Sequence, residues 1–97
     1  MIICDVGSTQ NTKKFIMDNL YKIGEVISVK HIADHDAAEF ETIIEGEKDS
    51  IKIIGGLSSG YRGEGPRGLK YILVELGMPA DQAERYALSR GGFRHIF

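Results

Sequence analysis

The chain is poor in several residue types, and each scarcity excludes a class of protein. Of its 97 residues, one is cysteine, two are proline and none is tryptophan. A lone cysteine cannot form a disulfide within the chain, which excludes a disulfide-stabilised scaffold and favours a reducing, cytoplasmic location. No apolar run approaches the roughly 18 residues of a membrane-spanning helix, and Asp5 interrupts the first apolar run too early for a signal peptide. We therefore expect no membrane partner.

Length and composition predict one domain, comprising residues 1–97. A chain of this length buries roughly 65% of its unfolded surface, which is enough for a single hydrophobic core. Hydrophobic residues make up 42% of the chain and charged residues 27%, as is typical of a water-soluble domain. No linker, internal repeat or low-complexity segment divides the sequence.

Arginine is absent from the first 60 residues, although lysine is present there. Those residues contain six lysines and ten acidic residues, whereas residues 61–97 contain six basic and four acidic residues. All five arginines belong to this second part: Arg62, Arg67, Arg85, Arg90 and Arg94. The net charge of −2 argues against binding to a DNA or RNA polymer, which favours a strongly basic chain. The late arginines still allow a local positive site for a small anion.

The spacing of apolar residues predicts an α+β fold. Short apolar runs or period-two alternation predict strands at residues 1–6, 26–31, 40–44, 51–54 and 93–97. Apolar residues three and four positions apart predict helices at residues 10–23, 66–76 and 79–90. We expect the Gly7-Ser8-Thr9 turn to cap the first helix with a hydroxyl. The order β-α-β-β-β-α-α-β favours a mainly antiparallel sheet, with a C-terminal helical pair packed on it or projecting from it.

The helical pair at residues 66–90 bears on the oligomeric state. An apolar stripe runs along its first helix: Leu69, Ile72, Leu73 and Leu76. If the pair projects from the sheet, this stripe needs a partner, and a second copy of the chain is the simplest one. We therefore expect a homo-oligomer, either a dimer or a larger assembly.

The segment at residues 55–68, Gly-Gly-Leu-Ser-Ser-Gly-Tyr-Arg-Gly-Glu-Gly-Pro-Arg-Gly, carries the strongest functional signal, with six of the twelve glycines. Glycine lets the backbone approach a ligand closely, and the helix that follows offers free N–H groups to an anion. Arginine binds phosphate, and tyrosine stacks on a base. The segment therefore predicts an anion- or nucleotide-binding pocket. The alternative is a mobile connection that glycine merely keeps unstrained.

The same segment matches neither common phosphate-binding motif. It lacks the Gly-Lys-Ser/Thr ending of the Walker A motif. Gly63-x-Gly65-x-x-Gly68 has the spacing of the dinucleotide-binding fingerprint, but Pro66 inside it removes one N–H donor.

Four potential metal ligands lie within the six residues from His31 to Asp36. Histidine suits zinc or iron, and carboxylate suits magnesium or manganese, so His31, Asp34 and His35 are candidate ligands. A polar turn between two strands explains the same residues, and the chain has no second cluster of ligands. We expect neither a metal nor any other cofactor.

The sequence offers no clear pair of catalytic groups. Cys4 is expected in the core, where a thiol is inert. Ser58 and Ser59 could be nucleophiles only if a histidine reached them, and they are better suited to binding phosphate or ribose. Asp5 and Glu64 are the best general-base candidates, although Glu64 is equally suited to orienting an arginine or binding a ribose hydroxyl. We expect no enzymatic activity.

The run Gly60-Tyr61-x-Gly63-Glu64-Gly65-Pro66-x-Gly68 and the order of elements resemble the first family of phage anti-Thoeris sponge proteins. The resemblance covers most of the chain in element order and is residue-level only in the glycine-rich segment with its arginines. Such proteins are small phage-encoded oligomers that sequester cyclic-ADP-ribose-type signals made by TIR-domain defence enzymes. Related binders take cyclic oligonucleotides. The resemblance implies sequestration of a nucleotide signal in the bacterial host cytoplasm, without catalysis.

Resemblance and residue chemistry together predict one set of ligand contacts, drawn from the glycine-rich segment and the later arginines. The set is Ser58, Ser59, Tyr61, Arg62, Gly63, Gly65, Arg67, Gly68, Arg90 and Arg94. The first two arginines would clamp a pyrophosphate that the glycine amides cradle. The tyrosine would stack on adenine, and the serines would reach ribose hydroxyls. One of the last two arginines would close the site from a neighbouring subunit.

Two other classes of function remain open. One is a small metal-dependent phosphoesterase acting on such nucleotides, with His31, Asp34 and His35 holding the metal. The other is a protein-interaction or inhibitor module that uses the helical pair as its surface. The sequence leaves open whether the pocket lies within one chain or between two.

Overall fold

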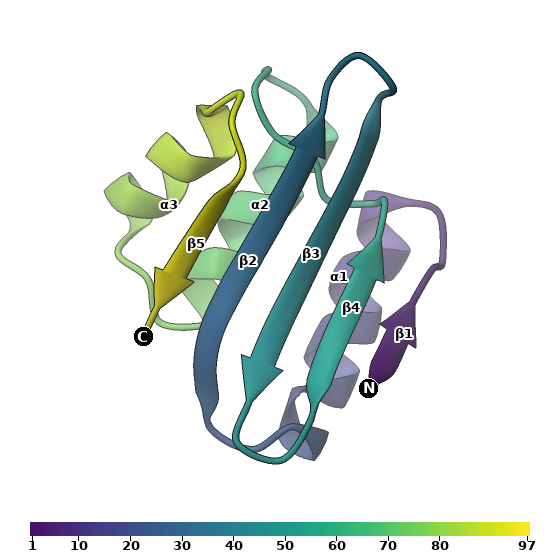
Figure 1. Cartoon of the computed structure of the whole chain (residues 1–97), viewed down its shortest axis with the longest axis vertical. Helices are drawn as coiled ribbons and strands as arrows, with labels where there is room; N and C mark the ends of the chain where they lie inside the picture. Colours follow the sequence, from purple (N-terminus) through teal and green to yellow (C-terminus); the bar gives the residue numbers. More distant parts are fainter.

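The computed structural model describes residues 1–97 and confirms the predicted α+β fold, with a five-stranded sheet and a C-terminal helical pair (Figure 1). The elements follow the predicted order, with one 3-10 turn (η1) after the first helix. Their bounds are β1 (Ile2–Cys4), α1 (Thr9–Asn19), η1 (Leu20–Lys22), β2 (Val26–Asp34), β3 (Glu39–Gly46), β4 (Ser50–Ile54), α2 (Glu64–Glu75), α3 (Ala80–Leu88) and β5 (Phe93–Ile96).

The strands lie in the order β1-β4-β3-β2-β5. Strands β2, β3 and β4 form an antiparallel meander, and β5 pairs antiparallel with β2. The exception is β1, which runs parallel to β4 with Ile2 opposite Ile51. Because β1 and β4 point the same way and each leads to a helix, the loops that start α1 and α2 leave the sheet at the same end. In open α/β sheets, ligands bind beyond the carboxyl ends of the parallel strands, which correspond to this end of the sheet.

The β2–β3 hairpin is longer than the predicted strands, since β2 continues to Asp34 and β3 begins at Glu39. Ile54 at the end of β4 pairs with Glu41, so the tip of the hairpin extends beyond β4 (Figure 1). The hairpin tip therefore forms a wall beside the loops that follow β1 and β4.

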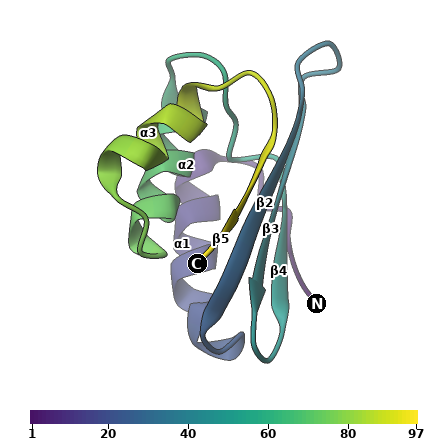
Figure 2. The ribbon, with the colours of Figure 1, turned by 60° about the vertical axis from the view of Figure 1, so that its left-hand side comes forward.

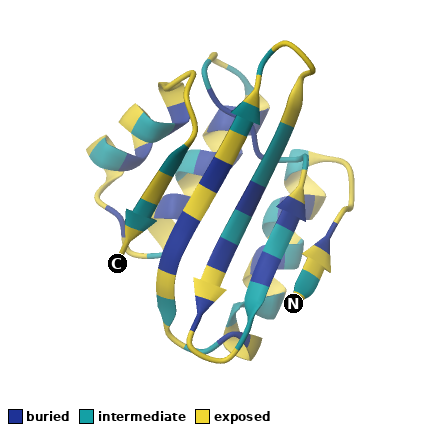
Figure 3. Cartoon of the chain, viewed as in Figure 1, coloured by how far each residue is buried: buried dark blue, intermediate teal, exposed yellow.

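All helices cover one face of the sheet and leave the other face uncovered (Figure 2). Buried and exposed residues alternate along the central strands, as period-two side-chain geometry requires (Figure 3). The covered face is filled by inward strand residues and by the stripe of α2: Cys4, Val29, Ile44, Ile51, Ile53, Leu69, Ile72 and Leu73. No helix is both long enough and apolar enough to cross a membrane.

The helical pair packs on the sheet instead of projecting from it. Three of the four stripe residues of α2 are fully buried in the core, and Leu76 packs against it. The stripe therefore finds its partner within the chain, which removes the reason for expecting a second copy at this surface. The homo-oligomer stays a prediction. Cys4 is buried as expected, and burial, with a smaller effect of Asp5, raises the pKa of its thiol to about 11.

Gly68 sets the approach of α2 to α1. A Cβ on Gly68 would overlap Cγ2 of Thr9 and lie 3.3 Å from Cδ2 of Leu57. We expect Gly68→Ala to lower the free energy of unfolding by about 1–3 kcal/mol, because the two helices must separate. Gly91→Ala is the control, since a Cβ there has no neighbour within 4 Å. Urea denaturation compares the two, and equal stabilities would contradict the close packing.

Candidate functional site

A large pocket of about 1030 Å³ opens at the end of the sheet where β1 and β4 terminate. Three segments line it: the β1–α1 turn, the glycine-rich segment and the upper part of the β2–β3 hairpin. The glycine-rich segment contributes Ser58, Tyr61 and Gly65, three of the predicted ligand contacts. The pocket exists because the parallel pairing of β1 and β4 brings the first two segments together.

The two helices that begin at this pocket, α1 and α2, differ in how the N–H groups of their first turns are hydrogen-bonded. Ser8 caps α1 by accepting a hydrogen bond from the N–H of Asn11 at 3.1 Å, which confirms the predicted cap. No side chain caps α2, whose N-cap residue is Gly63. Helix geometry leaves the N–H groups of Glu64 and Gly65 without partners inside the helix. The starts of both helices therefore retain N–H donors, because the cap of α1 satisfies only the N–H of Asn11.

Tyr61 lies across the start of α2. Its hydroxyl makes a 2.7 Å hydrogen bond with Oγ of Ser58, and its ring is half exposed. A Cβ on Gly63 would lie 2.8 Å from Cε2 of Tyr61, and one on Gly65 would overlap Oγ of Ser58. These two glycines, predicted to cradle phosphate, have a structural role that the sequence did not reveal, because they make room for Tyr61 and Ser58.

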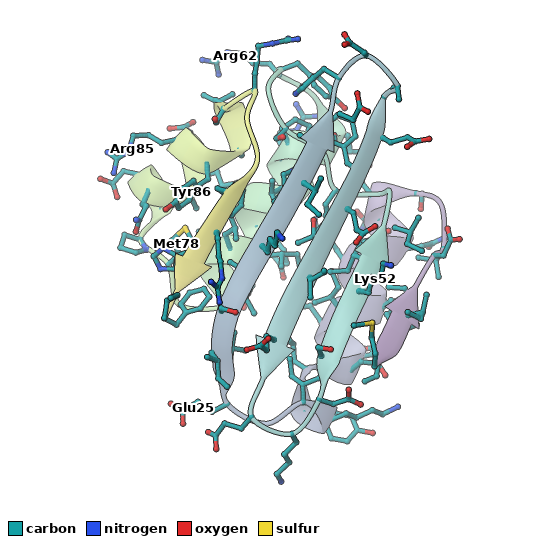
Figure 4. All side chains as sticks on the ribbon, in the orientation of Figure 1. Glu25, Lys52, Arg62, Met78, Arg85 and Tyr86 are labelled. Carbon is teal, nitrogen blue, oxygen red and sulfur yellow. The ribbon has the colours of Figure 1, made fainter.

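A second pocket, of about 280 Å³, lies between α2 and α3. We call it the basic pocket, because Arg62, Arg67 and Lys70 line it. Lys70 pairs with Glu84 at 3.8 Å, whereas Arg62 and Arg67 form no ion pair. Arg62 extends away from the ribbon at the top of the molecule (Figure 4). Tyr61 lines this pocket as well as the large one, so it forms the wall between them.

The large pocket has the opposite charge. Its charged lining residues are all acidic: Asp34, Glu39, Glu41 and Glu64. Asp34 accepts a hydrogen bond from the N–H of Ala37 at 3.1 Å, and Glu41 lies 3.7 Å from Nζ of Lys52. Glu39 and Glu64 have no hydrogen bond or ion pair to another side chain, which leaves two carboxylates free to bind a ligand.

A buried hydrogen-bond network lies beneath the pocket. His31 makes a 2.8 Å hydrogen bond with Oγ1 of Thr42 through Nδ1 and a 3.0 Å hydrogen bond with Oγ of Ser59 through Nε2. Burial, and next the charge of His35, lower the pKa of His31 from its ordinary 6.5 to about 4. The histidine is therefore neutral at pH 7. Ser59, a predicted ribose contact, has no exposed surface and instead serves this network.

The three candidate metal ligands do not converge. Nowhere in residues 1–97 do three histidine, cysteine or acidic side chains form a group that could hold a metal. Both ring nitrogens of His31 are already hydrogen-bonded. The ring of His35 packs edge-on against Phe40 at 5.3 Å, and its buried Nε2 has no partner. Asp34 is engaged in the hairpin turn.

The remaining predicted contacts lie in different places. Gly68 is buried against α1. Arg90 is exposed, and a Cβ on Gly60 would come within 3.1 Å of its Cα, so it lies beside the glycine-rich segment. Arg94 pairs in register with Lys30, and its neighbour Phe93 packs on the core. Arg94 therefore projects from the uncovered face, away from both pockets.

Sequence reasoning missed the wall that the β2–β3 hairpin contributes, chiefly Glu39 and Phe40. The only available signal was the hairpin pattern itself, and nothing in it showed which end would face the glycine-rich segment. Comparisons of this chain with protein-family models, with curated proteins and with solved structures found no match.

Proposed function

We propose that the chain binds and sequesters a small nucleotide of the cyclic-ADP-ribose type, without converting it chemically. The observation that carries this proposal is the pair of pockets on either side of Tyr61, one basic and one lined by hydroxyls and free carboxylates. A nucleotide has the matching division, because its phosphates are anionic and its sugar carries hydroxyl groups. The large pocket, at about 1030 Å³, is at the upper end of the range for small-molecule sites, about 300–1,000 Å³.

The phosphate end of the ligand is supported by two features. Arg62 and Arg67 have no competing ion pair, and a guanidinium makes two parallel hydrogen bonds to phosphate. Lys70 lines the same pocket, which therefore holds three basic residues and one acidic residue, Glu84. Together they provide charge and directed donors for a pyrophosphate.

The aromatic rings at the large pocket support the proposal that the ligand contains a base. Tyr61 presents a half-exposed ring, and Phe40 lines the hairpin wall. Stacking of a base on an aromatic side chain contributes about 1–3 kcal/mol and tolerates different bases. These rings therefore supply affinity but leave the identity of the base open.

Binding without conversion agrees with the state of the two candidate nucleophiles. Ser58 lines the large pocket, but its Oγ is hydrogen-bonded to the hydroxyl of Tyr61 and not to a histidine. Ser59 is hydrogen-bonded to a neutral histidine, but neither residue is reachable from the pocket. The resemblance of the glycine-rich segment to the sponge family extends the proposal to removal of an immune signal in the bacterial cytoplasm. A metal-dependent phosphoesterase would need His31, Asp34 and His35 to converge, and their arrangement does not support it.

The experiment is a thermal-shift titration with cyclic ADP-ribose isomers and with cyclic di- and trinucleotides. Each ligand is tested in EDTA and again with added magnesium or manganese. We expect a rise in Tm with a cyclic-ADP-ribose-type ligand that is the same with and without metal, because no metal takes part. No shift with any ligand would overturn the proposal.

Loss of the two free arginines tests the phosphate contacts. We expect the double variant Arg62→Gln, Arg67→Gln to bind the same ligand at least about 100-fold more weakly, since each charged hydrogen-bonded contact contributes about 1.5–3 kcal/mol. Arg85→Gln is the matched control, because Arg85 is exposed on α3 and lies outside both pockets. Calorimetric titration measures the affinities, and an equal effect of the control would contradict a local role.

A further inference from the structure

We infer that the ligand carries a free ribose diol as well as a phosphate, and that it lies across Tyr61 with the diol in the large pocket and the phosphate in the basic pocket. This inference rests on the proposed nucleotide-binding function. It adds the orientation of the ligand and a chemical requirement that distinguishes nucleotides from one another.

The separation of charge at the two pockets fixes the orientation. Every charged residue lining the large pocket is acidic, whereas the basic pocket holds the two unpaired arginines. A phosphate in the large pocket would face Glu39 and Glu64 with no cation beside it. The same phosphate next to Arg67 would gain two charge-assisted hydrogen bonds.

The free carboxylates determine what the large pocket can bind. A carboxylate only accepts hydrogen bonds, and its two oxygens match the two hydroxyls of a vicinal diol. Of the four acidic residues, Glu39 and Glu64 have no partner in the protein. Glu39 belongs to the hairpin and Glu64 to α2, so the diol would sit between the two walls of the pocket.

Tyr61 determines how the ligand crosses from one pocket to the other. It is the one residue that lines both pockets, and its hydrogen bond to Ser58 holds the ring in place. On α2, the lining residues of the basic pocket are Pro66, Arg67 and Lys70, and those of the large pocket are Glu64 and Gly65. At 3.6 residues per turn the two sets lie on opposite sides of the first turn. A ligand that contacts both therefore passes over Tyr61.

This arrangement predicts a preference among cyclic nucleotides. Cyclic ADP-ribose is closed through its base and its 5′ pyrophosphate, so both ribose diols are free, and an isomer closed through a 2′ or 3′ oxygen of one ribose still keeps the diol of the other. A cyclic di- or trinucleotide with 3′–5′ linkages consumes every 3′ hydroxyl and keeps no vicinal diol. We expect the first class to bind and the second to bind more weakly.

The test uses two probes, cyclic ADP-ribose and inorganic pyrophosphate, with calorimetric titration of three variants. Glu39→Gln keeps the shape of the side chain but loses an acceptor oxygen and the charge. We expect it to weaken cyclic ADP-ribose binding about tenfold, while pyrophosphate binding stays the same or becomes tighter. Arg67→Gln is expected to weaken both probes. Glu75→Gln, at the far end of α2 and outside both pockets, is the control.

The outcomes separate this inference from the function on which it rests. Weaker binding of both probes by Glu39→Gln would point to a structural effect and overturn the diol contact. Unchanged binding of cyclic ADP-ribose by that variant would also overturn it, while the proposed function would stand on the wild-type titration. If the wild-type chain binds a 3′–5′ cyclic dinucleotide more tightly than cyclic ADP-ribose, the diol requirement is wrong. Failure of the wild-type chain to bind any nucleotide would overturn both proposals.

Discussion

Replacing Gly65 with alanine is expected to weaken nucleotide binding by roughly 10- to 100-fold, although the substitution only exchanges a hydrogen atom for a methyl group. The added methyl group would overlap Oγ of Ser58 and lie 3.2 Å from the hydroxyl of Tyr61. Their hydrogen bond would break, and the ring that divides the two pockets would move. The ligand would lose its stacking surface without losing any charged contact.

The measurement is calorimetric titration of cyclic ADP-ribose into Gly65→Ala and into Gly91→Ala. Gly91 is the matched control because a Cβ there meets nothing within 4 Å. The added methyl group is expected to lower the free energy of unfolding by about 1–3 kcal/mol. Circular dichroism at the working temperature must therefore show that the variant is folded. A folded Gly65→Ala variant with wild-type affinity would contradict the role given to Tyr61.

The second large effect is on stability as the pH falls. We expect the free energy of unfolding to decrease by on the order of 3 kcal/mol between about pH 6.5 and pH 4 because of His31. Its pKa is lowered in the folded state to about 4, so the unfolded chain binds the proton first. The contribution is fully present above pH 6.5 and is lost as the pH falls toward 4. The neutral His31 ring also stacks on the rings of Phe40 and Phe93, with distances between ring centroids of 6.1 and 5.5 Å.

Urea denaturation at pH 7, 5.5 and 4.5 measures this effect. His31→Gln is expected to be less stable at pH 7, because Thr42 and Ser59 lose their partner, and to depend less on pH in this window. Both proteins contain His35, whose charge opposes protonation of His31. The comparison therefore changes His31 alone. The account of His31 fails if the wild type and the variant lose stability in parallel as the pH falls.

Local patterns were sufficient for most of the fold. The stripe of α2, with Leu69, Ile72 and Leu73 buried, and the β2–β3–β4 meander follow from residues close together in the sequence. The parallel pairing of β1 with β4 was not predictable in this way, because it joins Ile2 to Ile51, which are separated by about half of the chain. That pairing decides which loops meet and therefore where the large pocket forms.

The sequence predicted the residue types of the candidate site but not how these residues are distributed between two pockets. Composition identified Tyr61, Arg62 and Arg67, because glycine, tyrosine and arginine before a helix indicate phosphate and base recognition. Composition did not show that Ser59 turns inward to His31, since two adjacent serines in a loop give no periodicity. Nor did it show Glu39 on the opposite wall, which depends on the length of the hairpin.

The central claim is that the chain holds a nucleotide without changing it. The most direct measurement incubates excess protein with cyclic ADP-ribose, removes the unbound ligand, denatures the protein by heat and analyses the released ligand by mass spectrometry. We predict that the ligand is recovered intact, in amounts that follow the protein concentration. Recovery of a cleaved product would show an enzyme, and recovery of no nucleotide would show that the two pockets serve another purpose.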